Sequence, residues 1–183
     1  MEIDLGKLYS QIKEQLKIAN IYQVPRITKV VINVGVGKNR DNKQFLEAVR
    51  ADIAKVTGQK PYVRTARKAV AGFNVREGNI VGYVVTLRGK RMEDFVNRFV
   101  HVTLPRVRDF RGLSMSGLDQ QGNLNVGVTE HLAFPEIHQD QTDVVFGMQV
   151  TFVTSTRDRE VAETMFRQLS FPLRTAEQEA DEA

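Results

Sequence analysis

Residues 27–36, Ile-Thr-Lys-Val-Val-Ile-Asn-Val-Gly-Val, contain the alternation that decides the fold. Every second residue from Val30 to Val34 is apolar, whereas Lys29 and Asn33 fall on the other side of the extended chain. A period of two is typical of a strand with one buried face and one polar face. We therefore expect a sheet whose second face is open to solvent or to a ligand.

The segments around this strand show either the helical or the strand period. Apolar residues at steps of three and four predict helices, and apolar residues that alternate with polar ones predict strands. Together they predict an α+β domain with helices packed on one face of a mainly antiparallel sheet. The expected helices are one through 5–16 with Asp4 as N-cap that Asn20 and Pro25 end, one that begins near Asp41 or Asn42 and is closed by Gly58, one through 92–99 that Pro105 terminates, and one through 161–169; the expected further strands are 61–65, 70–75, 82–89, 124–128 and 148–152, with a hairpin between Val70 and Arg88.

The length and composition predict one domain. A chain of 183 residues is long enough to bury a core. We expect a single domain over residues 1–174 and a disordered acidic tail over 175–183. The chain has no cysteine, no signal-like apolar stretch and no run long enough to span a membrane, so we expect a cytoplasmic protein.

Charge is distributed unevenly along the chain. Residues 26–111 hold 19 Lys and Arg against 7 Asp and Glu, whereas residues 112–183 hold 4 against 12. A basic block is what a polyanion such as nucleic acid selects, because cations near phosphates release condensed counterions. Residues 112–155 contain no Lys or Arg, which suits a protein partner better than RNA. A basic surface that only maintains solubility is the alternative.

A glycine pair after the first strand raises the alternative of a nucleotide-dependent enzyme. Gly35-Val36-Gly37 follows a strand and precedes a helix, as in a dinucleotide fingerprint. The third glycine of that fingerprint is replaced by Arg40, and Asn39 stands where a phosphate-binding loop needs Ser or Thr. We therefore do not expect nucleotide binding here.

No metal, cofactor or catalytic site is predicted. The three histidines lack the spacing of a zinc hydrolase, and the chain has no cysteine nucleophile. Glu136, Asp140 and Asp143 lack the dense oxygen spacing of a calcium loop and are interpreted as a solvated acidic segment. The sequence therefore favours a binding protein over an enzyme.

Five motifs, in a fixed order over nearly the whole chain, resemble one known family. They are Val30–Gly37, Thr57–Pro61, Thr86–Gly89, Leu104–Leu113 and Phe134–Ile137. The chain resembles the bacterial type of the large-subunit ribosomal protein five family, which binds 5S rRNA in the central protuberance. The resemblance implies a structural ribosomal protein with 5S rRNA, 23S rRNA and neighbouring 5S-binding ribosomal proteins as partners.

The resemblance also implies which residues meet rRNA. Those at the family's sheet face are Asn33, Gln59, Thr86 and Arg88, and the strand alternation places three of them on the polar side. Amide, hydroxyl and guanidinium groups can hydrogen-bond riboses, phosphates and unpaired base edges. Further phosphate contacts are predicted at Lys29, Arg64, Arg67 and Lys68.

Two other contacts follow from the resemblance alone. The loop 74–82 is expected to approach the elbow of the peptidyl-site tRNA, through Asn74, Arg76, Gly78 and Asn79. The acidic stretch 134–143 is expected to meet small-subunit ribosomal protein thirteen across a subunit bridge, through Phe134, Glu136, Asp140 and Asp143.

The chain departs from the family pattern in three places. Leu118-Asp119-Gln120-Gln121-Gly122 replaces a stretch with an additional glycine and a basic residue, and Asn74 and Ala69 replace Lys and Ser. These departures bear on loop contacts. A module that binds other RNA or an acidic protein remains the second alternative.

Overall fold

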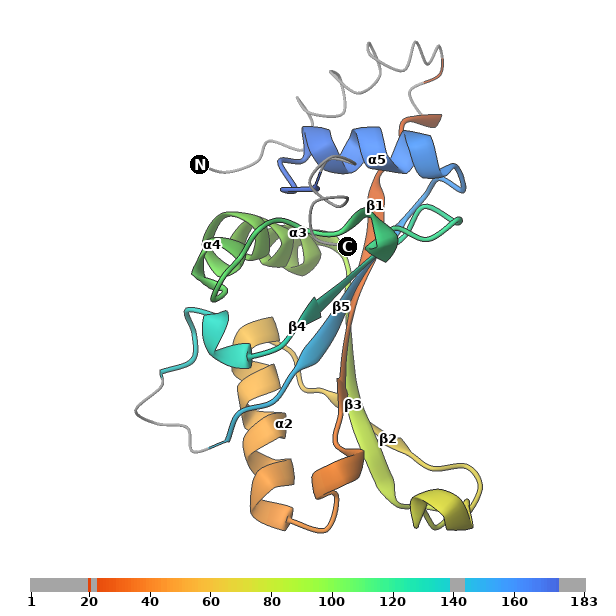
Figure 1. The fold of residues 1–183 in the computed structure, drawn as a ribbon, viewed down its shortest axis with the longest axis vertical. Helices are drawn as coiled ribbons and strands as arrows, with labels where there is room; N and C mark the ends of the chain where they lie inside the picture. The colour runs from red at the N-terminus through yellow and green to blue at the C-terminus, as the bar shows by residue number, and fades with distance from the viewer. Residues whose placement is uncertain (1–19, 21–22, 139–143, 175–183) are drawn as a thin grey trace.

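The computed structural model describes residues 20, 23–138 and 144–174, so the helix expected at 5–16 and the tail 175–183 lie outside the described residues. All strand pairs are antiparallel and form one sheet in the order β2-β3-β1-β5-β4. The predicted α+β class is confirmed (Figure 1). The elements are β1 (Ile27–Gly35), α2 (Lys43–Thr57), β2 (Tyr62–Thr65), β3 (Ile80–Leu87), α3 (Gly89–Arg98), α4 (Leu104–Arg106), β4 (Leu124–Val128), β5 (Met148–Thr154) and α5 (Arg159–Gln168).

The opening strand β1 lies at the centre of the sheet. It pairs with β3 through Val31 opposite Thr86, and with β5 through Val31 opposite Thr151. Val30 and Val34 are fully buried, whereas Asn33 is exposed, as the alternation predicts. The central position explains why β1 carries the longest apolar alternation.

Helices α2 and α3 cover one face of the sheet. In Figure 1 they lie on the same side of the strands, and α5 lies at the upper end of the strands. Aromatic rings fill the space between: Phe99 lies 5.4 Å from Phe152 of β5 and 5.9 Å from Phe95 of α3, measured between ring centroids. Phe166 of α5 extends the cluster, 6.5 Å from Phe152. The core is therefore on the helix side.

Helix α2 begins and ends as its sequence predicts. The Asn42 side chain accepts a hydrogen bond from the Phe45 amide, and Gly58 adopts a left-handed conformation with φ 64°. Both are standard capping arrangements. None of the described helices is long and apolar enough to cross a membrane.

The prediction that Pro105 terminates the third helix is wrong. Residues 99–103 form a π-helical segment after α3, and α4 contains Pro105 near its start. The Leu104 amide donates to the carbonyl of Phe99, five residues earlier. Because the chain begins a new helical turn at Leu104, the missing N–H of Pro105 falls in the first turn, where proline is tolerated.

The strand predicted at 70–75 is also wrong. Residues 71–73 form a 3-10 turn, and Asn74 has a left-handed φ of 52°. This reversal makes Val70 and Val75 pair with each other instead of with a neighbouring strand. The hairpin is therefore formed by β2 and β3, and residues 66–79 are its long loop. A turn at Glu77 and Gly78 precedes β3.

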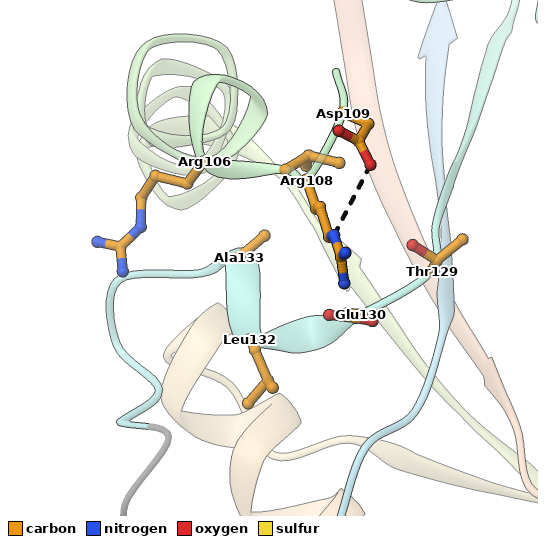
Figure 2. Close-up of a pocket in the computed structure, with 8 residues that line it drawn as sticks. Arg106, Arg108, Asp109, Thr129, Glu130, Leu132 and Ala133 are labelled. Carbon is orange, nitrogen blue, oxygen red and sulfur yellow. Dashed lines mark ion pairs between the residues drawn. The ribbon is translucent and has the colours of Figure 1, made fainter.

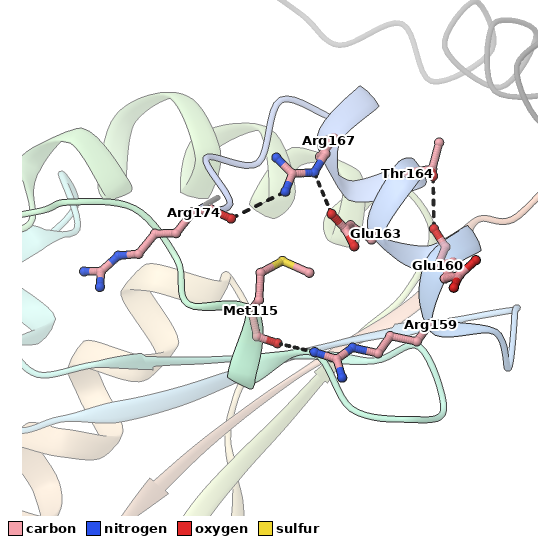
Figure 3. A network of polar contacts seen from close by, with 7 residues as sticks. All are labelled: Met115, Arg159, Glu160, Glu163, Thr164, Arg167 and Arg174. Atoms are coloured by element: carbon pink, nitrogen blue, oxygen red, sulfur yellow. Dashed lines mark hydrogen bonds and ion pairs between the residues drawn. The ribbon is translucent and has the colours of Figure 1, made fainter. Parts of the chain in front are cut away.

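Most basic residues of the second half of the chain serve the fold. Figure 3 shows Arg159 and Arg167 on α5 and Arg174 beyond it. Arg159 donates to the Met115 carbonyl at 3.1 Å, and Arg167 pairs with Glu163 at 2.9 Å and donates to the Arg174 carbonyl at 3.4 Å. Arg174 donates to the Gly112 carbonyl at 3.2 Å. These contacts tie α5 to the segment that precedes β4.

A buried ionisable pair joins α2 to the segment before β5. His131 Nε2 lies 3.4 Å from Asp52 Oδ2, a long distance for a hydrogen bond, and both side chains are buried. The His131 ring stacks on Phe146 with centroids 3.9 Å apart. Burial lowers the pKa of His131 below its ordinary value of 6.5, and the nearby Asp52 carboxylate offsets only part of this effect. The positive charge of Lys55 lowers the pKa of His131 further.

We expect the free energy of unfolding to fall as the pH drops below about 6.5. The unfolded chain binds a proton at His131 more readily than the folded chain, so acid favours unfolding over the interval between the two pKa values. Urea unfolding at pH 7.5 and 5.5 should show a smaller pH effect in His131→Gln than in the unchanged protein. The exposed His101→Gln control should keep the full effect; equal pH effects in all three would contradict the role of His131.

Candidate nucleic-acid interface

The face of the sheet opposite the helices is a polar surface that runs across all five strands. The strand register places Tyr62, Val84, Asn33, Gln149 and Gly127 in one row from β2 to β4. The neighbouring row contains Thr86, Val31, Thr151 and Asn125. We call this surface the open face.

The open face contains no carboxylate. None of the residues in the five strands is Asp or Glu, whereas Lys29 of β1 and Arg64 of β2 both point away from the core. Arg88 follows β3 directly and is exposed. Strands that carry cations and no carboxylate form a surface that attracts phosphates.

Three of the predicted rRNA-binding residues lie close together on this face. Asn33 pairs with Val84, so Thr86 is its diagonal neighbour across β1 and β3, roughly 7–8 Å away for such positions. Arg88 lies two residues beyond Thr86. The predicted strand 82–89 includes Arg88, but β3 ends at Leu87 and Arg88 is the N-cap of α3. Among the described residues, neither the side-chain amide of Asn33 nor the guanidinium of Arg88 has a hydrogen-bond partner within the protein.

The fourth predicted residue, Gln59, lines a groove at the β2 edge of the open face. Its Nε2 donates to the Thr86 carbonyl at 3.4 Å, which connects the end of α2 to β3. The groove has a volume of about 440 Å³. Its lining residues are Gln59, Lys60, Tyr62, Arg64, Val84 and Thr86.

Sequence reasoning missed the polar groups on the other half of the open face. The Thr151 hydroxyl donates to Asn125 Oδ1 at 2.8 Å, and Gln149 Nε2 donates to the same oxygen at 3.4 Å. The sequence contains the pattern that predicts this placement, because Gln149 and Thr151 alternate with the buried Met148, Val150 and Phe152. These residues continue the open face as far as β4.

The predicted tRNA-contact residues lie in the long β2–β3 loop. Arg76 is exposed, Gly78 has a positive φ of 85°, and the Asn79 carbonyl accepts from the Ala66 amide at 2.9 Å. The neighbouring rRNA candidates Arg67 and Lys68 are exposed at the start of the same loop.

One arginine from outside the loop fixes its tip. The Arg40 guanidinium donates to the Phe73 carbonyl at 3.2 Å and to the Asn74 carbonyl. This arrangement leaves the Phe73 ring 77% exposed. The tip is therefore held in place by the segment between β1 and α2, while its side chains face outward.

The predicted bridge residues are only partly described. Phe134 is buried and lies 6.1 Å from Phe95 between ring centroids, so its side chain belongs to the core and we withdraw it from the bridge surface. Glu136 forms an ion pair with Arg98 at 2.9 Å and its side chain is 25% exposed. Asp140 and Asp143 lie outside the described residues.

A pocket on the helix side offers a contrast to the open face. It lies between the turn after α4 and residues 129–133 and has a volume of about 430 Å³. Figure 2 shows Arg108 paired with Asp109 and extending toward Glu130, with the guanidinium 3.7 Å from the Asp109 carboxylate. Carboxylates beside the arginines offset their attraction for an anion, so this pocket is a weaker candidate for phosphate.

The glycine motif after β1 lacks the surroundings of a nucleotide site. Residues 37–39 form a 3-10 turn, and α2 begins only at Lys43. β1 pairs with antiparallel neighbours on both sides, whereas a dinucleotide fingerprint belongs to a parallel strand–helix–strand unit. This arrangement opposes the alternative of a nucleotide-dependent enzyme.

The sequence is similar to those of known proteins over most of its length. Residues 20–76 match the family Ribosomal protein L5, and residues 80–173 match the ribosomal L5P family C-terminus. The chain belongs to the ribosomal protein L5 family. It is 42% identical over 168 residues to the large ribosomal subunit protein uL5 of Ralstonia pickettii (strain 12J), covering 92% of this chain and 93% of that protein.

Membership in the L5 family confirms the resemblance drawn from the five motifs. The family consists of structural, non-enzymatic proteins of the large ribosomal subunit, so the chain is a structural constituent of that subunit. The two matched regions meet between β2 and β3, which pair in the same sheet.

Proposed function

We propose that this protein binds 5S rRNA through the open face and helps attach it to 23S rRNA in the central protuberance of a cytoplasmic ribosome. The observation that carries the proposal is that the open face lies opposite α2 and α3, has no carboxylate in its five strands and presents polar side chains. Among the described residues, the side chains of Asn33 and Arg88 have no hydrogen-bond partner, so their donors are available to a polar ligand.

The chemistry of these side chains suits RNA. Amides read exposed base edges or riboses, and a guanidinium pairs with phosphate through a planar fork of donors. The basic surplus of residues 26–111 adds the general attraction for phosphates on which such contacts depend. Phosphate contacts at Lys29, Arg67 and Lys68 belong to the same proposal.

The β2–β3 loop is proposed to contact the peptidyl-site tRNA. Its support is the exposed Arg76 near a tip that Arg40 holds in place. A preorganised loop loses less conformational entropy on binding than a free one. Asn74, Gly78 and Asn79 lie in this loop and belong to the same proposal.

The acidic segment around Glu136 is proposed to meet small-subunit ribosomal protein thirteen. Its support is the absence of Lys and Arg from residues 112–155, which leaves a surface suited to a basic protein. The pairing of Glu136 with Arg98 reduces the charge available at that one position. In this proposal Asp140 and Asp143 therefore supply most of the negative charge.

Competition between 5S rRNA and bulk tRNA tests the proposed function. We expect labelled 5S rRNA to remain bound in the presence of excess bulk tRNA as salt rises, because hydrogen bonds add to the salt-sensitive attraction for phosphates. Filter binding across a salt series measures this directly. If bulk tRNA competed as well as unlabelled 5S rRNA at every salt concentration, the protein would bind polyanions in general and the proposed function would be wrong.

A further inference from the structure

An exposed aromatic ring lies at the edge of the open face. Tyr62 of β2, a strand at the edge of the sheet, is 68% exposed. The guanidinium of Arg64 lies over the Tyr62 ring, 5.9 Å from its centroid. A cation–π contact of this kind holds both planar groups in a defined arrangement.

The ring is placed where bound RNA would pass. Tyr62 pairs with Val84, which in turn pairs with Asn33, so the ring lies in the same row as a residue proposed to bind RNA. It also lines the groove that contains Gln59 and Thr86. Hydrogen-bonding groups therefore lie beside a flat apolar surface.

We infer that Tyr62 and Arg64 form a stacking site for an unpaired base of the RNA that the open face binds. The site rests on the proposed function, because it shares Thr86 and Gln59 with the RNA-binding surface. Arg64 covers part of the ring, and the base stacks on the remaining exposed surface. This assigns Arg64 a role in orienting the ring as well as in attracting phosphate.

The position at the sheet edge selects an unpaired base over a duplex. β2 is an edge strand, so no described strand pairs with its outer side and the Tyr62 ring can be approached from that side. Bases inside a duplex are stacked on each other, and only an unstacked base offers its face to an aromatic side chain. Lys60, exposed in the same groove, is suited to the phosphate of that nucleotide.

The first test compares two substitutions that differ in stacking capacity. Tyr62→Leu removes the ring and keeps an apolar side chain, and we expect its affinity for 5S rRNA to fall roughly 5- to 150-fold, the range for loss of one stacked base. Tyr62→Phe keeps the ring and should bind within about 2-fold of the unchanged protein, since stacking needs the π-face rather than the hydroxyl.

The second test detects stacking directly. The chain contains no tryptophan, so Tyr62→Trp provides a single indole at the site, whose emission can be excited apart from that of the tyrosines. We expect 5S rRNA to quench its emission, because a stacked base lies in contact with the indole. Val102→Trp, at an exposed position on the helix side, is the matched control and should keep its emission.

The outcomes separate this inference from the proposed function. Failure of the unchanged protein to prefer 5S rRNA over bulk tRNA would overturn the proposed function and the stacking site with it. Normal preference for 5S rRNA, together with unchanged affinity in Tyr62→Leu and no quenching in Tyr62→Trp, would overturn the stacking site alone. Loss of affinity in Tyr62→Leu with quenching in Tyr62→Trp supports it.

Discussion

Phe99→Ala is expected to lower the free energy of unfolding by about 3–5 kcal/mol, the range for removing a buried phenyl ring from a core. Phe99 is fully buried and packs between α3, the segment after residues 131–133 and the sheet: its ring centroid lies 5.9 Å from Phe95, 6.2 Å from Phe134 and 5.4 Å from Phe152. The loss combines the transfer free energy of the ring with the cavity left among these neighbours. Urea unfolding followed by circular dichroism measures it.

Phe73→Ala is the matched control for this prediction. The substitution removes the same ring from a side chain that is 77% exposed, so the free energy of unfolding should change by no more than about 0.5 kcal/mol. A domain of this size is commonly stable by roughly 5–15 kcal/mol, so the core substitution removes a large share of the total. Equal effects of the two substitutions would show that the aromatic cluster does not hold the helices to the sheet.

Local patterns in the sequence predict the elements that hold this core. The alternation in β1 predicts its buried face, and Asn42 and Gly58 predict both ends of α2 because capping depends on a few adjacent residues. The order of the strands in the sheet cannot be predicted from such local patterns. No pattern within β2 or β4 indicates that they occupy opposite edges, because strand order depends on contacts between distant segments.

The errors in the predicted elements have local causes that a period alone does not reveal. Val70 and Val75 have strand-forming side chains, but the left-handed Asn74 turns the chain back between them. Pro105 stops a regular α-helix, but the π-helical segment before it restarts the turn. In both cases the backbone conformation of a few residues outweighs side-chain propensity.

The candidate site was predictable in part. Alternation places Asn33 and Thr86 on the polar side of their strands, and the register shows that the two strands are neighbours. The exposure of Tyr62 was not predictable, because alternation cannot tell an edge strand from a central one. Phe134 shows the converse limit: a family motif indicated the segment, but packing against Phe95 decides the orientation of its side chain.

Arg88 carries the prediction with the largest expected effect on binding. Arg88→Ala should weaken 5S rRNA binding by about 1–3 kcal/mol, roughly 5- to 150-fold, because it removes a charge-assisted hydrogen bond to the RNA. Arg88→Glu should weaken it further, since the new carboxylate would be the first on a surface whose strands contain none. Filter binding of labelled 5S rRNA at fixed salt measures both.

Arg50→Glu separates a local contact from a change in net charge. Arg50 is exposed on α2, on the helix side of the sheet, and its substitution changes the formal charge by the same amount as Arg88→Glu. At moderate salt, screening limits interactions between exposed charges to about 10 Å, so Arg50→Glu should have little effect on 5S rRNA binding. Equal losses in the two variants would mean that RNA responds to the overall field of the protein. A loss confined to Arg88→Glu would support direct contact between the open face and the RNA.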